Sequence, residues 1–183
     1  VAGAWGAPIE SFLRPVCHVL VRRPYAQVQT LLDGTQPKGR RYYWKSEYLP
    51  RIEPALLPKF MEHAARIRSP HSAVIFFQIG GALNRLPAEH SPAGNPDARY
   101  VLNVAGSWEA AADDAAHVGW ARDAWGGMRS FSTGGTYVNF LTEEEGADRM
   151  RAAYRSNYPR LASLKAKWDP DNLFHTNKNI GGS

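Results

Sequence analysis

Three segments with the composition of β-strands limit the folds that this chain can adopt. They read RRYYWKSEYL, SAVIFFQIGGAL and ARYVLNVAGSW, and all are rich in β-branched or aromatic residues. Apolar residues recur at helical spacing between the first two segments, over residues 54–67, and after the third, over 112–129. On the second of these helices the expected buried stripe is Val118, Ala121, Trp125 and Met128. The pattern predicts a protein in which helices cover a small sheet.

The other segments add short elements to this pattern. A short helix is expected over residues 26–34, where apolar residues share one face and Gly34 follows as a stop signal. YVNF, residues 137–140, is interpreted as a further strand, because three strand-favouring residues surround one asparagine. Thr142 and Glu145 have the spacing of a capping box, so a helix is expected over 143–155.

A parallel α/β sheet would also fit this order of elements, but the nucleotide-binding motifs of that class are missing. GxGxxG and GxxxxGK[ST] do not occur. The glycine pairs at 80–81, 126–127 and 134–135 lack the third glycine. The predicted fold class is therefore α+β, with a mainly antiparallel sheet, helices on one face and an irregular C-terminal tail.

Composition excludes several functional classes. The 183 residues carry a formal net charge of +5, but the lysines and arginines are scattered, so no tract resembles a nucleic-acid-binding arm. Cys17 is the only cysteine, which excludes an intrachain disulfide and the cysteine-based zinc patterns. No apolar run reaches the roughly 18 residues of a membrane span, and the first residues make a poor signal peptide. We therefore expect a cytoplasmic protein without nucleic-acid or membrane partners.

Most candidate catalytic residues have an ordinary structural explanation. The six histidines show no metal-binding spacing, so no metal site is predicted. Asp113 and Asp114 open a helix, where carboxylates favour the positive end of the dipole. The aromatic residues of RRYYWKSEYL allow two interpretations, a platform for an aromatic or carbohydrate-like ligand or packing on a sheet face.

The last third of the chain carries the most specific pattern. YVNF, a helix and then NYPRLASLKAKWDPDNLFHTNKNI, with a second helix expected over 158–167, resemble the C-terminal segment of berberine-bridge-enzyme-like FAD-linked oxidases. The positions that match are Tyr137, Asn139, Asn157, Arg160, Leu161, Lys165, Trp168, Asp169, Pro170, Asn172, Phe174, Asn177, Asn179 and Ile180. Lys178 departs from the family pattern, where glutamine is usual. The resemblance extends over about residues 23–180 and leaves residues 1–22 without a counterpart.

The resemblance implies three parts and a flavin site. Residues 1–22 are a poorly placed segment, 23–135 a substrate-domain-like α+β region, and 136–183 the C-terminal segment of the same domain. It assigns FAD contacts to Tyr137, Asn139, Asn177 and Asn179, with Tyr137 also the candidate catalytic residue. It assigns substrate contacts to Tyr42, Tyr43, Trp44, Phe77, Asn103 and Phe140. As a strand, YVNF would turn Tyr137 and Asn139 toward the flavin and Val138 into the core.

The same resemblance implies that the chain works with an FAD-binding domain, in the same polypeptide or on a separate chain. We expect the chain to be the substrate-binding, C-terminal part of an FAD-dependent oxidoreductase of the vanillyl-alcohol-oxidase/PCMH type, whose flavin accepts a hydride from a small organic substrate. Alone, without that domain, the chain is expected to be inactive and free of flavin. The alternative is a stand-alone ligand-binding module without redox activity. Phe140 stands where some relatives place a tyrosine base, and it cannot accept a proton.

Overall fold

The structure, a computed structural model, describes residues 21–92, 95–176 and 178–181. They belong to two units, one ending at Lys38 and the other spanning Gly39–Ser183. The described part of the first unit contains helix α2 (Tyr25–Gln29) and a 3-10 turn (Asp33–Thr35). The helix predicted over 26–34 is therefore shorter than expected. Since α2 buries none of its residues, a helix of this sequence lacks the tertiary packing that would extend it.

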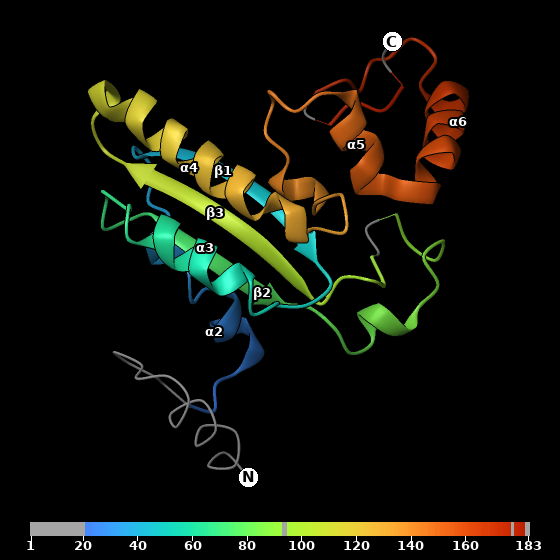
Figure 1. Ribbon diagram of the computed structural model, residues 1–183. Coiled ribbons are helices and arrows are strands. Elements are labelled where there is room, and N and C mark those ends of the chain that lie inside the picture. The colour runs from blue at the N-terminus through green and yellow to red at the C-terminus, as the bar shows by residue number, and fades with distance from the viewer. Residues whose placement is uncertain (1–20, 93–94, 177, 182–183) are drawn as a thin grey trace. The chain divides into compact units, whose positions relative to one another are not determined.

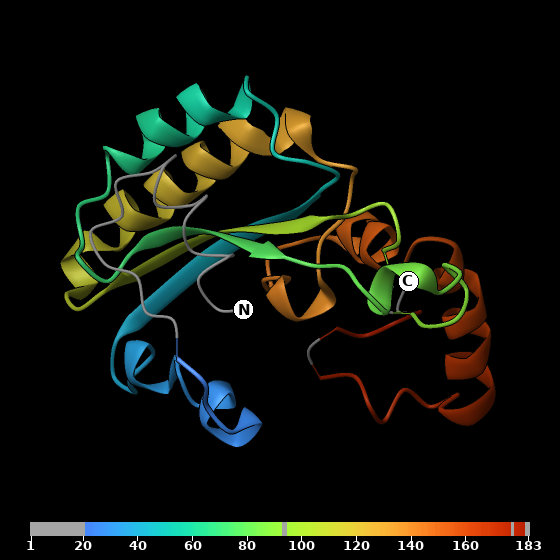
Figure 2. The same ribbon diagram turned by 90° about the horizontal axis from the view of Figure 1, so that it is seen from below.

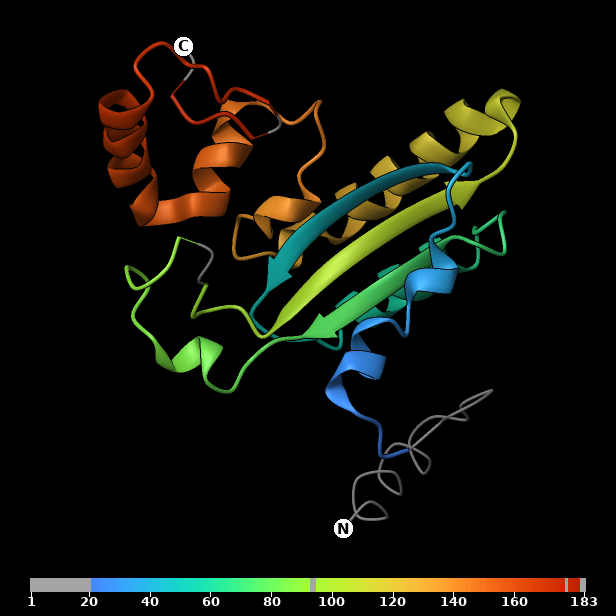
Figure 3. The same cartoon turned by 180° about the vertical axis from the view of Figure 1, so that it is seen from behind.

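A three-stranded antiparallel sheet forms the centre of the second unit (Figure 1). Its strands are β1 (Arg41–Leu49), β2 (Ala73–Gln78) and β3 (Tyr100–Trp108), in the order β1-β3-β2. All three coincide with the strand-like segments of the sequence, and the predicted α+β class is confirmed. Figure 3 shows β3 between the other two strands. The register therefore aligns residues of β1 and β2 across β3, so that Ser46 and Ile75 both pair with Asn103.

Two helices, α3 (Leu56–Ala64) and α4 (Asp114–Met128), cover one face of the sheet (Figure 2). The main core lies between them and the sheet and includes Leu49, Leu102 and Val104. Burying each such side chain contributes roughly 1.5–3 kcal/mol to folding. The buried residues of α4 are His117, Trp120, Ala121, Ala124 and Met128.

The predicted stripe on α4 is thus only partly correct. Ala121 and Met128 are buried, but Val118 and Trp125 lie at the margins of the packed face and are half-buried. Trp125 packs against the edge of the core, and its indole Nε1 donates a hydrogen bond to the carboxylate of Glu47, at 2.9 Å.

The prediction of a strand at YVNF is wrong, because residues Val138–Phe140 form a 3-10 turn. The preceding segment does pair with β1: Thr133 N–H donates to the Tyr48 carbonyl, and Tyr48 N–H donates to the Gly135 carbonyl, both at 3.0 Å. Gly135 then leaves the extended conformation at a φ of +130°. Phe140 N–H bonds back to the Tyr137 carbonyl at 2.8 Å and closes the turn. Strand alternation therefore does not govern where residues 137–140 point.

The chain ends in helices α5 (Ala147–Tyr154) and α6 (Tyr158–Trp168) and an irregular tail. The helix predicted over 143–155 begins late because the expected capping interaction closes a separate turn: Glu145 accepts the Thr142 backbone N–H at 3.1 Å. The helix predicted over 158–167 is confirmed. In the tail, Asp169 accepts the backbone N–H groups of Leu173 and Phe174. Within the described ranges, no helix is long and apolar enough to cross a membrane.

Candidate functional site

A cavity of about 760 Å³ lies beside the first half of the edge strand β1. One wall comes from β1, and the other comes from the 3-10 turn at Val138–Phe140, the segment that follows it and Lys178 of the C-terminal tail. The lining residues are Tyr42, Tyr43, Trp44, Asn139, Leu141, Thr142, Glu143, Glu144 and Lys178. Four of these, the three β1 aromatic residues and Asn139, are residues that the sequence analysis assigned to a ligand site. The fold therefore brings together two segments that lie far apart in the sequence.

The candidate residues on the sheet divide between its two faces. Tyr43 packs with the core under α3 and α4. Because side chains alternate along a strand, Tyr42 and Trp44 point to the opposite face, which we call the second face. The register places Asn103 and Phe77 on the second face as well. Most of the predicted substrate residues on the sheet thus share one surface, and Tyr43 reaches the cavity from the other side.

The second face holds a hydrogen-bond donor and an acceptor that have no partner in the described part of the chain. These are the indole Nε1 of Trp44 and the Oδ1 of Asn103, and both atoms are buried. Asn103 is only 8% exposed. The two residues are diagonal neighbours, since Trp44 pairs with Ala105 and Asn103 pairs with Ser46. Leaving a buried polar atom unpaired costs about 1–3 kcal/mol. Trp44 lines the cavity, whereas Asn103 is not among its lining residues.

Tyr137 and Asn139 lie together even though their segment is not a strand. The Asn139 Nδ2 donates a hydrogen bond to the Tyr137 hydroxyl oxygen at 2.7 Å. That bond leaves the Tyr137 proton available for another acceptor. Phe140 packs edge-on against the Tyr137 ring, with centroids 5.5 Å apart, and tilted against Phe77 at 6.0 Å. The turn is therefore fixed to the second face by aromatic contacts.

Tyr48 extends this aromatic cluster. Burial, reinforced by the neighbouring Tyr137, raises the pKa of Tyr48 to about 12, against the opposing effect of Arg155. The Tyr48 hydroxyl consequently stays protonated at neutral pH and can act only as a neutral hydrogen-bonding group.

Glu144 is the electrostatic centre of the cavity wall. It accepts hydrogen bonds from the Tyr43 hydroxyl and from Arg122, and Lys45 Nζ lies 2.7 Å from its carboxylate. Arg122 Nε also donates to the Tyr43 oxygen, at 2.9 Å. Burial acts to raise the pKa of Glu144, but the hydrogen bonds from Lys45, Tyr43 and Arg122 outweigh it and lower the pKa to about 2. The carboxylate is therefore ionised and fully engaged at neutral pH.

This depressed pKa predicts an acid-dependent loss of stability. The ordinary pKa of the group is 4.5, so its contribution is fully present above that value and is lost as the pH falls from about 4.5 toward about 2. Glu144→Gln should reduce the slope of stability against pH in this window. Urea unfolding at a series of pH values, for both proteins, measures the difference. Parallel pH profiles for the two proteins would contradict the prediction.

A second carboxylate, Glu47, is fully buried behind this wall, at 0% exposure. It accepts hydrogen bonds from Trp125 and Ser132 and lies 2.8 Å from Arg149 Nη1. Arg149 also donates to the Ser46 carbonyl at 2.9 Å. These contacts tie α4, the segment after it and α5 to β1. The carboxylate of Glu47 is thus satisfied by groups from three later segments.

The remaining candidate residues give less information about the site. Asn179 has a buried Oδ1 without a partner in the described residues, whereas Asn177 and Cys17 lie outside the described residues. Sequence reasoning missed Glu47 and Arg149 altogether. No local signal could have singled out Glu47, because the same strand also carries the charged residues Arg41 and Lys45.

Comparisons with known proteins support the pattern found in the last third of the chain. A model of the family described as Berberine and berberine like matches residues 136–181. An FAD-linked oxidoreductase of Dictyostelium discoideum is 26% identical over 178 residues, which cover 94% of this chain and 38% of the relative. GilR, an oxidoreductase that catalyses the terminal step of gilvocarcin biosynthesis and was solved with pregilvocarcin, is 26% identical at a TM-score of 0.69, over 79% of this chain and 33% of its own. Berberine bridge enzyme from Eschscholzia californica shares the fold at 14% identity and a TM-score of 0.81, over 100% of this chain and 44% of its own. The chain spans less than half the length of each of these proteins.

Proposed function

Because residues 136–181 match the model of the family described as Berberine and berberine like, we propose that the chain is the substrate-side part of an FAD-dependent oxidoreductase of the vanillyl-alcohol-oxidase/PCMH type. A flavin of this kind accepts a hydride from a bound organic substrate. The observation that carries the proposal is the unpaired donor and acceptor on the second face, at Trp44 and Asn103. They lie on the same surface as the aromatic cluster that fixes Tyr137 and Asn139.

The residues present suit a flavin and a substrate in different ways. Asn139 uses one N–H on Tyr137 and keeps a second N–H and its oxygen for a ligand. The buried Oδ1 of Asn179 is a further acceptor without a partner in the described residues. Tyr137 is the proposed catalytic group, since its hydroxyl can exchange a proton with a bound substrate and the Phe140 side chain has no such group. Trp44 and Asn103 would orient the polar group of the substrate.

The partner in this proposal is an FAD-binding domain, supplied by the same polypeptide or by a separate chain. The exposed apolar residues of the C-terminal end support a docking surface for it. They are Leu164, Trp168, Leu173 and Phe174. Large exposed apolar patches mark interaction sites on protein surfaces. Lys165 and Asp169, which bond to each other and to the tail backbone, hold this end of the chain in place.

The test compares the chain alone with the chain joined to an FAD-binding region from its own gene. The joined protein is expected to be yellow, and a panel of aromatic and sugar alcohols should contain one that bleaches its flavin absorbance without oxygen. The chain alone is expected to be colourless. A joined protein that binds ligands but no flavin would contradict the proposal and leave the alternative, a stand-alone ligand-binding module.

Asn103→Leu should separate function from stability in this protein. The substitution removes an amide whose buried oxygen has no partner in the described chain, so the free energy of unfolding of the chain should stay constant or rise by about 1 kcal/mol. In the joined protein the lost hydrogen bond to substrate should lower kcat/KM about tenfold, the equivalent of roughly 1.4 kcal/mol. Urea unfolding and steady-state flavin reduction measure the two effects.

Asn84→Leu is the matched control, because Asn84 also has a buried Oδ1 without a partner in the described residues, but its Nδ2 donates to the carbonyls of Pro96 and Ala98, at 3.2 Å and 2.6 Å. It should lower the free energy of unfolding by about 1–3 kcal/mol and leave turnover of the folded protein unchanged. If Asn103→Leu behaved like this control, Asn103 would be a structural residue.

A further inference from the structure

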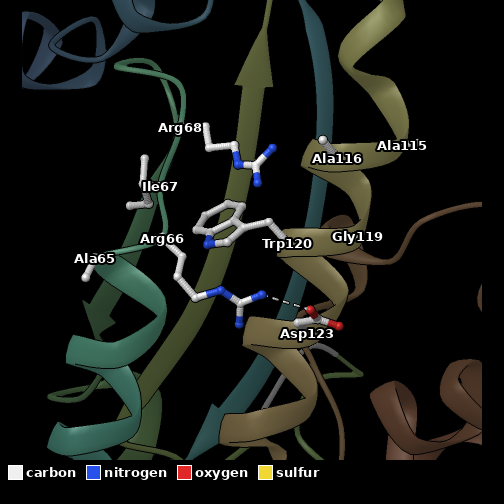
Figure 4. Close-up of a pocket in the computed structure, with 9 residues that line it drawn as sticks. All are labelled: Ala65, Arg66, Ile67, Arg68, Ala115, Ala116, Gly119, Trp120 and Asp123. Atoms are coloured by element: carbon white, nitrogen blue, oxygen red, sulfur yellow. Dashed lines mark hydrogen bonds and ion pairs between the residues drawn. The ribbon is translucent and has the colours of Figure 1, made fainter.

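A second cavity, of about 500 Å³, lies in the helix layer and shares no lining residue with the candidate site. The segment that follows α3 forms one wall, with Arg66 and Arg68 (Figure 4). The other wall is the surface of α4. Three of the residues that line this wall are small, Ala115, Ala116 and Gly119, and they leave space between the helix and the opposite wall.

The floor of this cavity is rigid. Trp120 is buried, and its indole Nε1 donates a hydrogen bond to the His63 carbonyl at 3.0 Å. Figure 4 shows the indole ring between the guanidinium groups of Arg66 and Arg68, which both point into the space between the walls. The two cationic groups are thus arranged on either side of a fixed aromatic ring.

The cavity carries an unneutralised positive charge. Asp123 is the carboxylate among its lining residues, and it pairs with Arg66 Nη2 at 3.2 Å. Arg68 is exposed and has no hydrogen-bond or ion-pair partner in the described part of the chain. The side chain of a surface arginine with no binding role is expected to extend into the solvent. The Arg68 guanidinium instead points toward α4.

We propose that this cavity binds a small molecule bearing a carboxylate or phosphate group. Arg68 supplies the main contact, because a planar guanidinium donates two parallel hydrogen bonds to either oxyanion. Arg66 adds a second donor while it remains paired with Asp123. The rest of the ligand lies against the small residues of α4. A cavity of about 500 Å³ has room for a small organic molecule there.

The experiment is an NMR titration of the full chain with inorganic phosphate, with benzoate, and with benzamide as a neutral counterpart of benzoate. Saturable shifts of the Gly119 amide and the Trp120 indole N–H are expected with phosphate, benzoate or both, and not with benzamide. Arg68→Gln should weaken the binding about tenfold or more. Which anion binds distinguishes a phosphate from a carboxylate ligand.

Arg85→Gln is the matched control, because Arg85 is exposed and likewise lacks a partner in the described residues, but does not line the cavity. It removes the same charge and should leave the affinity unchanged. Absence of saturable shifts, an equal response to benzamide, or equal weakening by Arg68→Gln and Arg85→Gln would each overturn the proposal.

Discussion

Glu47→Ala is expected to lower the free energy of unfolding by about 3–5 kcal/mol, because removing one partner of a buried ion pair leaves the other uncompensated. Arg149 is 14% exposed at its side chain and would keep its contacts to Glu145, at 3.4 Å, to the Ser46 carbonyl and to the Trp125 ring. Arg129, which lies 3.8 Å from Glu47, would lose this partner as well. The hydrogen bonds from Trp125 and Ser132 would also be lost. Urea unfolding followed by tryptophan fluorescence measures the effect.

Glu53→Ala is the control for this prediction. Glu53 forms an ion pair with Arg51 at 3.0 Å, but the Arg51 side chain is 75% exposed. Pairs of this kind contribute about 0–1 kcal/mol. Comparable losses in the two variants would mean that the Glu47 carboxylate is not desolvated and that its contacts add little to the fold.

Gly135→Ala is expected to cost about 2–4 kcal/mol, because it combines backbone strain with a steric clash. Gly135 has a φ of +130°, a conformation that residues with side chains rarely adopt. A Cβ atom there would lie 2.8 Å from the backbone oxygen of Ala152 in α5. Because that atom belongs to a helix backbone, α5 would have to move. Thermal unfolding and the chemical shifts of the α5 amides report the loss of stability and the displacement.

The neighbouring Gly134 provides a control with similar strain and free space. Its φ is +77°, and no atom lies within 4 Å of an added Cβ. Gly134→Ala should therefore cost about 1 kcal/mol and leave the α5 amides unperturbed. A larger loss at Gly134 than at Gly135 would show that the close approach of α5 is not a constraint.

Local sequence patterns predicted the sheet and the long helices, because those elements follow from composition and periodicity within short windows. The strands RRYYWKSEYL and ARYVLNVAGSW are examples, and both are observed within a few residues of their expected bounds. YVNF failed because its conformation depends on distant groups. Tyr48 ends the strand pairing at Gly135, and Phe77 provides the surface on which Phe140 packs.

The candidate site was predictable in its residue types and not in its geometry. Aromatic residues on β1 and an asparagine in a family motif could be recognised as ligand-binding candidates. That Asn139 and β1 line one cavity depends on how the last third of the chain packs against the sheet. The roles of Glu144 and Glu47 depend on partners such as Arg122 and Arg149, which no local pattern connects to them.

The buried Glu47 carboxylate also has a consequence for building chimeric enzymes. The family match begins at residue 136, which suggests a point at which the segments of two relatives could be exchanged. Arg149 lies within that segment, while Glu47, Trp125 and Ser132 lie before it. A graft at residue 136 would therefore leave the Glu47 carboxylate or the Arg149 guanidinium without its ion-pair partner, unless the donor segment supplied the matching charge. The start of the family match at residue 136 therefore does not separate two energetically independent parts of the fold, and an exchange there has to preserve the charge pairing between position 47 and position 149.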